Sequence, residues 1–175
     1  MPGDDDDREL FDEEHPGPQV LESALAHTAL SEVVSQPPLM VSASTTLADT
    51  IHLMQQERRA SVLVMENDRL VGIFTERDIL MKIAGQPLDL VHTPVATSMT
   101  PDPFTLPDDA NVAFALSKMV LEGFRHIPLV DDDGRPTAVV SMRNLIEYLG
   151  EIYSRELLTM PPEPRQHRFK SREGA

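Results

Sequence analysis

The sequence predicts an α/β (α+β) fold in which two β-α-β-β-α repeats pack together as a pseudo-twofold pair. Three observations lead to this prediction. The segment 34–80 is similar to the segment 99–146, both segments show the same order of strand and helix patterns, and one such unit has too few strands and too little core to be stable alone. Two units can bury their sheet faces against each other, which accounts for the tandem arrangement.

The internal repeat keeps a constant spacing over most of its length. Leu47 matches Val112, 65 residues later in the chain. This spacing holds until one residue is inserted in the second repeat, after which Thr75 matches Ser141, 66 residues later. Chance rarely preserves one spacing across a strand, a helix, a second strand and a loop, so we interpret the chain as a duplication. The other matched positions are Pro38, Ala48, Met54 and Ser61 with Pro103, Ala113, Met119 and His126.

The first repeat is expected to run strand, helix, hairpin, helix. Thr46, with Asp49 behind it, supplies N-cap chemistry for a helix. Leu47, Ile51 and Met54 then form one apolar face at spacings of four and three residues. The expected elements are a strand at 39–41, a helix from 47, strands at 61–65 and 70–74 around a polar turn, and a closing helix at 76–84.

The second repeat is expected to follow the same order. Asp108 or Asp109 is the predicted N-cap of a helix that begins at Val112. A further helix at 21–34 is expected before the first repeat. The expected elements of the second repeat are a strand at 104–106, a helix from 112, strands at 127–130 and 138–140, and a closing helix at 143–153, with 87–98 linking the repeats.

Composition restricts the class of function. The chain of 175 residues is long enough for one ordinary domain with tails, and 41% of it is hydrophobic. The formal net charge of −14 argues against a nucleic-acid-binding surface. No apolar run approaches the roughly 18 residues of a membrane span, and there is no cysteine for disulfides or thiolate metal sites. We expect a cytoplasmic protein with no nucleic-acid partner and no membrane partner.

The chain is expected to consist of a paired core with two tails. Residues 1–14 carry eight acidic residues and one arginine, a net charge of −7, and they are too polar to offset the entropy of ordering them. A solvated leader is favoured for this segment over an interaction arm. The expected divisions are an acidic disordered tail at 1–17, an N-terminal helix with the first repeat at 18–90, the second repeat at 91–155, and a C-terminal tail at 156–175.

The sequence shows no catalytic constellation. Its six histidines form no H-x-x-H or H-E-x-x-H motif. The acidic turn Asp131–Gly134 lacks the alternating ligands of a calcium loop, and a hairpin turn explains it better. Too few residues lie outside the repeats for a separate catalytic domain. We expect neither an enzyme nor a metal site.

Three stretches resemble the motifs of CBS domains, the family named for cystathionine β-synthase. Gly72–Asp78 resembles the signature G-h-x-[ST]-x-x-[DN], Arg125–Asp131 resembles the strand that usually precedes it, and Met99–Pro103 resembles the opening of a second motif. The resemblance covers about residues 31–150. It implies a tandem pair, or Bateman module, that binds adenosyl ligands such as AMP, ADP, ATP, NAD or S-adenosylmethionine in two clefts between the repeats. It also implies further assembly as a dimer of pairs.

Thr75 and Asp78 are the first candidates for ligand binding. A hydroxyl at a strand end and a carboxylate three residues later lie on the same side of a helix, and a carboxylate can accept from both hydroxyls of a ribose. The alternative is that the two residues only cap the helix as a capping box. The resemblance favours binding.

Ser141 and Asn144 take the matching positions in the second repeat. An amide can donate to and accept from ribose hydroxyls, but it carries no charge. Gly72 is matched by Ala138 or Val139. From these changes we expect the cleft at Ser141 and Asn144 to bind more weakly or to be vacant.

The candidate phosphate contacts are arginines and one histidine. The resemblance places phosphate contacts at Arg125 and His126; the first repeat has Arg59, Ala60 and Ser61 there, and so only one cationic residue. Arg77 and Arg143 could face a phosphate or an acidic neighbour. Lys82 and Lys118 are expected to be charges on a helix surface.

The favoured function is a regulatory module that senses adenine nucleotides and controls a separate enzyme, channel or transporter. No cofactor is required, and the expected ligand is AMP, ADP or ATP. The alternative is a structural or dimerisation module without ligand binding. A homodimer is expected, because the predicted helices carry more apolar residues than one sheet face can cover. In the competing arrangement, the helix at 21–34 folds back over them within one chain.

Overall fold

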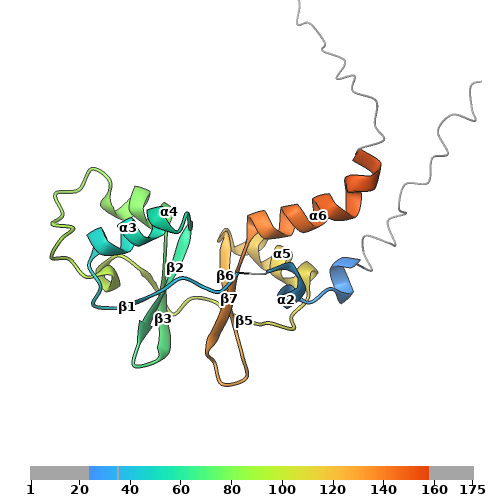
Figure 1. The fold of residues 1–175 in the computed structure, drawn as a ribbon, viewed down its shortest axis with the longest axis horizontal. Helices are drawn as coiled ribbons and strands as arrows, with labels where there is room; N and C mark the ends of the chain where they lie inside the picture. Colours follow the sequence, from blue (N-terminus) through green and yellow to red (C-terminus); the bar gives the residue numbers. More distant parts are fainter. Residues whose placement is uncertain (1–23, 35, 158–175) are drawn as a thin grey trace, which may run out of the picture.

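A computed structural model describes residues 24–34 and 36–157, which form two units joined by crossing connections (Figure 1). Each unit has the order β-α-β-β-α, so the predicted fold class is confirmed. The predicted acidic tail at 1–17 lies outside the described residues, as does the predicted C-terminal tail at 156–175 except for residues 156 and 157, which belong to the last helix. No helix within the described ranges is long and apolar enough to cross a bilayer.

The first repeat forms a four-stranded sheet in the order β1-β2-β3-β4. β1 runs parallel to β2, and β2 and β3 form an antiparallel hairpin. The hairpin turns at Asn67 and Asp68, whose φ angles of 49° and 61° fit a type I′ turn. The elements are β1 (Met40–Ser42), α3 (Leu47–Gln56), β2 (Ser61–Glu66), β3 (Arg69–Thr75), the helical turn α4 (Glu76–Asp78) and the π-helical turn η1 (Ile79–Ile83).

The second repeat forms a three-stranded sheet in the order β5-β6-β7. β5 is parallel to β6, and β6 and β7 form the hairpin. The closing helix ends at Leu157, beyond its predicted end at 153. The elements are β5 (Leu106–Pro107), α5 (Val112–Glu122), β6 (His126–Val130), β7 (Pro136–Ser141) and α6 (Met142–Leu157), preceded by η2 (Val95–Thr97) and by β4 (Thr100–Pro101), which pairs with β3.

The helix caps confirm one prediction and correct another. Thr46 caps α3, because its Oγ1 accepts from the Asp49 N–H at 3.1 Å. The prediction of Asp108 or Asp109 as the second cap was wrong: Asn111 caps α5, and its Oδ1 accepts from the Phe114 N–H at 2.8 Å. An N-cap must directly precede the first helical residue, whereas the two aspartates lie in the turn before it.

The helix predicted at 21–34 is interrupted within its described part. Residues 24–27 are helical, and α2 (Leu30–Val33) follows after a break. At the break Ala29 is extended and forms a β-bridge with Asn111. The Leu30 N–H therefore donates to the Ala110 carbonyl of the second repeat at 2.8 Å, and a tertiary contact replaces a helical bond.

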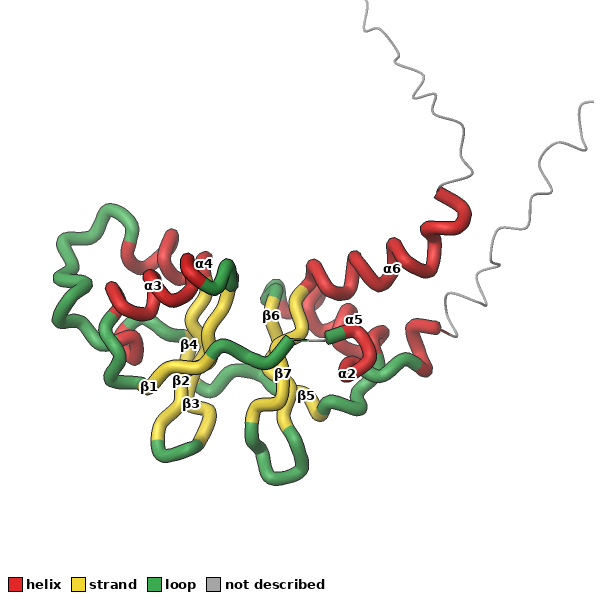
Figure 2. The backbone as a smooth tube through the Cα atoms, in the orientation of Figure 1, coloured by secondary structure: helices red, strands yellow, loops and turns green. Residues whose placement is uncertain are grey.

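The beginning of each repeat is docked on the other repeat. We call residues 28–31 and 93–96 the lead-in segments. In the first, the Leu30 N–H donates to Ala110, and at the matching position of the second, the Val95 N–H donates to the Thr45 carbonyl at 2.8 Å. The other matched bonds join Ser31 to Asp108 and Val112 to Thr28 on one side, and Ala96 to Ala43 and Leu47 to Thr93 on the other. Figure 2 shows the loop that carries the chain from α2 across to β1.

Each lead-in segment also contributes a buried side chain to the hydrophobic core of the other repeat. Leu30 is fully buried in the core of the second repeat, together with Leu106 and Val112. Val95 is fully buried in the core of the first repeat, together with Leu47 and Phe74. Neither repeat therefore fills its core with its own residues alone.

The second face of the strands is buried as well. Val62 and Val64 face the helices of the first repeat, whereas Leu63, which points to the opposite face of the strand, is also fully buried. Ile73 and Pro128 are also buried. Two sheets that are covered on both faces are what the pairing of the repeats requires, and the two hairpins lie next to each other (Figure 2).

Because Leu30 is buried in the core of the other repeat, we expect it to stabilise the whole pair. Leu30→Ala should lower the free energy of unfolding by about 2–5 kcal/mol, because it leaves a cavity in the core of the second repeat. The same substitution at Leu88, an exposed linker residue, should cost less than about 1 kcal/mol. Urea denaturation followed by circular dichroism measures both. Equal losses in the two variants would contradict the role of the lead-in segment.

Candidate functional site

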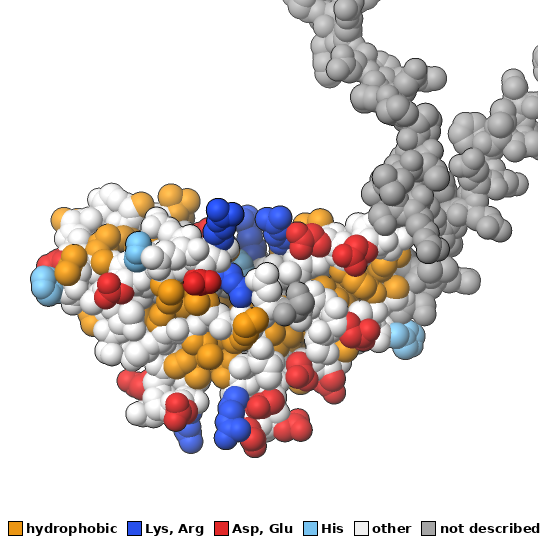
Figure 3. Space-filling view, in the orientation of Figure 1, with side chains coloured by type: hydrophobic (Ala, Val, Ile, Leu, Met, Phe, Trp, Pro, Cys, Tyr) orange, Lys and Arg blue, Asp and Glu red, His pale blue; other side chains and the backbone are white. Residues whose placement is uncertain are grey.

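A pocket of about 650 Å³ lies between the two repeats. Its apolar wall includes Val33, Val34 and Leu39 of the N-terminal segment and Val139 of β7. The polar lining includes residues from both repeats, and Figure 3 shows Lys and Arg side chains gathered at the junction of the repeats. We call this pocket the second cleft, because it contains Ser141 and Asn144 of the second repeat.

Ser141 and Asn144 form a reciprocal pair at the end of β7. The Asn144 Oδ1 accepts from the Ser141 N–H at 2.9 Å and from the Ser141 hydroxyl, and the Asn144 N–H donates to Ser141 Oγ at 3.2 Å. A backbone N–H can only donate, so the amide oxygen must face it and the amide NH₂ is left for other partners. Among the described residues, that NH₂ has no hydrogen-bond partner.

Arg58 follows the end of α3 in an unusual backbone conformation. Its φ is 51°, in the left-handed region. The matching residue of the second repeat is Gly123, with φ 76°. Residues other than glycine adopt this backbone region at a cost of about 1–2 kcal/mol. Such backbone strain is often found at functional sites. Arg58 lines the second cleft.

Arg59 and His126 line the second cleft together with Arg58. The Arg59 Nη2 donates to the Pro37 carbonyl at 2.7 Å, which fixes the guanidinium beside the N-terminal segment. His126 lies opposite Ser141 in the β6–β7 hairpin, and this register brings it into the pocket lining. Burial lowers the pKa of His126, and the charge of Arg125 lowers it further, so the imidazole is neutral near pH 7.

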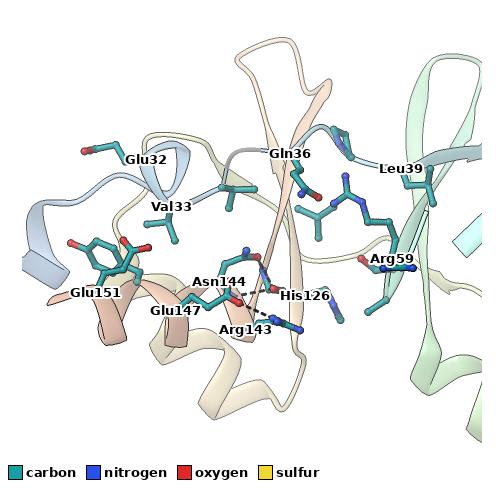
Figure 4. A pocket seen from close by; sticks show the side chains of 18 residues that line it. Glu32, Val33, Gln36, Leu39, Arg59, His126, Arg143, Asn144, Glu147 and Glu151 are labelled. Carbon is teal, nitrogen blue, oxygen red and sulfur yellow. Dashed lines mark hydrogen bonds and ion pairs between the residues drawn. The ribbon is translucent and has the colours of Figure 1, made fainter. Parts of the chain in front are cut away.

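Charge is distributed unevenly along the cleft. Figure 4 shows Glu32 and Glu151 at one end and Arg59 and His126 at the other. Between them, the Arg143 Nε donates to Glu147 Oε1 at 2.7 Å. Arg143 therefore faces an acidic neighbour, which is one of the two alternatives that the sequence left open. The cleft can accept a ligand with an anionic end directed toward the arginines.

Thr75 and Asp78 lie outside this pocket lining and form the same reciprocal pair. The Asp78 Oδ2 accepts from the Thr75 N–H at 2.9 Å and from the Thr75 hydroxyl at 2.7 Å. The two residues therefore form a capping box, with the same contacts as Ser141 and Asn144 in the second repeat. We call their surroundings the first cleft. Lys82 does not stand free on a helix surface as expected, because its Nζ lies 2.7 Å from Asp78 Oδ1.

Two further predicted site residues, besides Thr75 and Asp78, lie apart from the second cleft. The Arg77 Nη1 donates to the Gly123 carbonyl at 3.2 Å and so links the two repeats. Arg125 is exposed, and its carbonyl accepts from the Met142 N–H at 2.9 Å. The structure thus brings together Arg59, His126, Ser141, Arg143 and Asn144 around one pocket, and leaves Thr75, Arg77, Asp78 and Arg125 outside its lining.

Arg58 and Tyr148 line the cleft and were missed by the sequence analysis. The alignment of Arg58 with Gly123 is the signal that could have revealed the first, since it places an arginine where glycine is favoured. The Tyr148 hydroxyl bonds with Thr28 Oγ1 at 2.6 Å. Within the described residues, no group of three or more histidines or acids is placed to hold a metal ion.

Comparison with known proteins places these features in a family context. A family model described as CBS domain matches the chain twice, at residues 30–85 and 95–151. A 17.7 kDa protein from the bps2 3′ region of Acidianus ambivalens is 30% identical over 128 residues, which cover 73% of this chain and 76% of that protein. CBSCBSPB5, a CBS domain-containing protein of Arabidopsis thaliana, is 36% identical over 98 residues, which cover 56% of this chain and 18% of that protein.

A solved structure gives the same match in three dimensions. The CBS domain protein PAE2072 from Pyrobaculum aerophilum, complexed with AMP, is 27% identical to this chain with a TM-score of 0.65. The superposition covers 76% of this chain and 100% of that one. The two-repeat architecture is therefore shared over nearly the whole of the described residues.

The backbone strain at Arg58 predicts opposite effects of two substitutions. Arg58→Gly should raise the free energy of unfolding by about 0.5–1 kcal/mol, because relief of the left-handed strain exceeds the entropy that glycine adds to the unfolded chain. Arg58→Ala keeps the strain and should give no such gain. Urea denaturation of both variants measures the difference, and equal stabilities would contradict the strain at this position.

Proposed function

The chain belongs to the CBS domain family as a tandem pair, and from this premise we propose that it is a regulatory module that binds an adenine nucleotide between its repeats. CBS domain pairs are generally regulatory rather than catalytic. We propose that AMP, ADP or ATP binds in the second cleft and that the occupied pair acts on a separate enzyme, channel or transporter. The observation that carries the proposal is the pocket lined by Asn144 from one repeat and Arg59 from the other.

The second cleft suits the nucleoside part of such a ligand. Its volume of about 650 Å³ lies within the usual range for small-molecule sites, roughly 300–1,000 Å³. The apolar wall of Val34, Leu39 and Val139 can cover the faces of a base. The amide NH₂ of Asn144 can donate to ribose oxygens without breaking its bonds to Ser141.

The charges along the cleft suggest the orientation of the ligand. Arginine binds phosphate through a planar fork of donors, and Arg58 and Arg59 lie together at one end. His126, which is neutral near pH 7, can add a hydrogen bond but no positive charge. At the other end, Glu32 and Glu151 can accept from the exocyclic amine of adenine and would repel a phosphate.

AMP is the ligand to test first. It is bound in the solved structure of PAE2072, which is 27% identical to this chain. The proposal reverses the order of the two clefts that the sequence favoured. Thr75 and Asp78 carry the residue types of the family signature, whereas the pocket of about 650 Å³ is lined by Ser141 and Asn144.

A regulatory role follows from where the ligand would lie. A molecule held by Arg59 of the first repeat and by Asn144 of the second contacts both repeats at once. It can therefore favour one relative placement of the repeats over another, by as much as its affinities for the two differ. A partner protein that contacts both repeats would sense that placement.

The proposal predicts a phosphate-dependent role for Arg59. Arg59→Met should weaken AMP binding about ten- to a hundredfold, because a hydrogen bond to a charged group contributes about 1.5–3 kcal/mol. Adenosine, which lacks the phosphate, should lose less than about threefold. Isothermal titration calorimetry measures both ligands.

Arg135→Met is the matched control, since Arg135 is exposed on the β6–β7 turn and pairs with Asp133. It should bind AMP as the wild type does. Equal AMP affinity in the Arg59 and Arg135 variants would contradict a contact between Arg59 and the phosphate. If AMP, ADP, ATP, NAD and S-adenosylmethionine all fail to raise the melting temperature of the wild type, the structural-module alternative holds instead.

We also propose a twofold homodimer through the exposed ends of two helices. Leu80 and Met81 of η1, and Val120 and Leu121 of α5, are largely exposed. The bond from Arg77 to Gly123 brings these helix ends close together. The described part of the N-terminal segment, from residue 24, packs on the second repeat, where Thr28 bonds with Tyr148 of α6. A second copy related by a twofold axis would bury this exposed apolar surface.

The dimer predicts a clear change in mass. The wild type should scatter light as two chains at micromolar concentration, and Leu121→Asp should scatter as one, because a carboxylate cannot be buried there unpaired. Val91→Asp places the same charge on an exposed linker residue and should remain a dimer. A monomeric wild type, or a dimeric Leu121→Asp, would contradict this interface.

A further inference from the structure

The two clefts have the same backbone chemistry but differ in what contacts the acid or the amide. Asp78 is 7% exposed, and its Oδ2 accepts twice from Thr75. Its Oδ1 lies 2.7 Å from Lys82 Nζ and accepts from the Thr100 hydroxyl at 3.4 Å. A carboxylate has about four acceptor sites. All of them are therefore occupied by groups of the chain itself.

The ammonium group of Lys82 also has a partner for each of its hydrogen-bond donors. The group has three donors, and three acceptors surround it: the Asp78 carboxylate at 2.7 Å, the Ser98 carbonyl at 2.9 Å and the Met99 carbonyl at 3.2 Å. The lysine thus ties the end of the first repeat's closing helix to the segment that leads into the second repeat.

The second repeat has no such lysine at the matching place. Tyr148 is the counterpart of Lys82 in the repeat alignment, and its hydroxyl bonds with Thr28 while its ring lines the open cleft. Val33 and Val34, the counterparts of Ser98 and Met99, also line the open cleft. The positions that form the wall of the second cleft are therefore the ones that bind Lys82 in the first.

The backbone of the first repeat places Lys82 for this contact. Lys82 lies in the π-helical turn η1, where the Ala84 N–H donates to the Ile79 carbonyl at 2.9 Å, whereas Tyr148 lies in the regular helix α6. Met99 packs against Gly72 so closely that a Cβ there would lie 2.3 Å from its sulfur. Ala138, which matches Gly72 in the second repeat, already carries that Cβ. Gly72 thus leaves room for the side chain of Met99, whose carbonyl accepts from Lys82 at 3.2 Å.

From these contacts we infer that Lys82 is an internal counter-ion that closes the first cleft. The Asp78 carboxylate would have to exchange Lys82 for a ribose, and the lysine would keep only the Ser98 and Met99 carbonyls as acceptors. The inference rests on the proposed function for the second cleft. Its consequence is that each chain binds one nucleotide, at the second cleft, and that removal of the Lys82 ammonium opens the other.

The test is the number of AMP molecules bound per chain, measured by titration calorimetry of the full chain. The wild type should bind one. Lys82→Met keeps the aliphatic stem and should bind two. Lys118→Met, which removes the other lysine within the described residues, should still bind one. Thr75→Ala added to Lys82→Met should abolish the new site, and Arg59→Met should weaken only the original one.

A second variant guards against loss of folding. Lys82→Met combined with Asp78→Asn removes both charges and gives the first cleft the amide chemistry of the second, so no carboxylate is left unpaired. It should also bind two molecules of AMP. Two molecules in the wild type, or one in both Lys82 variants, would overturn the role of Lys82 and leave the proposed function standing.

The remaining outcomes separate the two ideas. If the wild type binds no AMP, but the Lys82 variants bind one molecule that is lost on Thr75→Ala, the closure by Lys82 holds and the proposed function of the second cleft is wrong. If neither the wild type nor either Lys82 variant binds AMP, both are wrong.

Discussion

The reciprocal docking of the lead-in segments is the contact on which the rest of the structure depends. Leu30 reaches the second repeat and Val95 reaches the first, and each is fully buried there. Because the chain must cross between the repeats to make these contacts, the segments after Leu30 and Val95 pass through the space where the repeats meet. Those crossing segments supply Val33, Val34 and Leu39 to the second cleft, and Ser98 and Met99 to Lys82.

A duplicated scaffold gives two sites that can diverge in side chains while sharing a backbone. Both repeats end the hairpin with the same reciprocal pair, Thr75 with Asp78 and Ser141 with Asn144. What differs is the residue one helical turn later, a lysine in one repeat and a tyrosine in the other. A buried carboxylate needs a compensating charge, whereas an amide does not. In the first repeat the charge of Lys82 therefore compensates that of Asp78. In the second repeat Asn144 and Tyr148 are both neutral, so no compensating charge is needed.

Sequence alone predicts the fold because the constant spacing between matched positions carries information over the whole repeat. The element order and the Thr46 cap followed from local patterns and are confirmed. Three other features do not follow from such local patterns, and only Arg58 left a signal in the sequence, its alignment with Gly123. Ala29 leaves the helix because Asn111 pairs with it; Lys82 faces inward because three acceptors converge on it; and Arg58 enters the cleft through a φ angle that local preference disfavours.

The exchange of segments also sets the order in which the protein can fold during synthesis. The first repeat lacks Val95 until the ribosome has passed the linker, and the core that Leu30 enters is incomplete until Leu145 has been synthesised. At about 5–20 residues per second this delay lasts roughly 6–23 seconds. For that time the nascent chain presents an unfilled core and an unburied leucine, which is the kind of surface that chaperones bind.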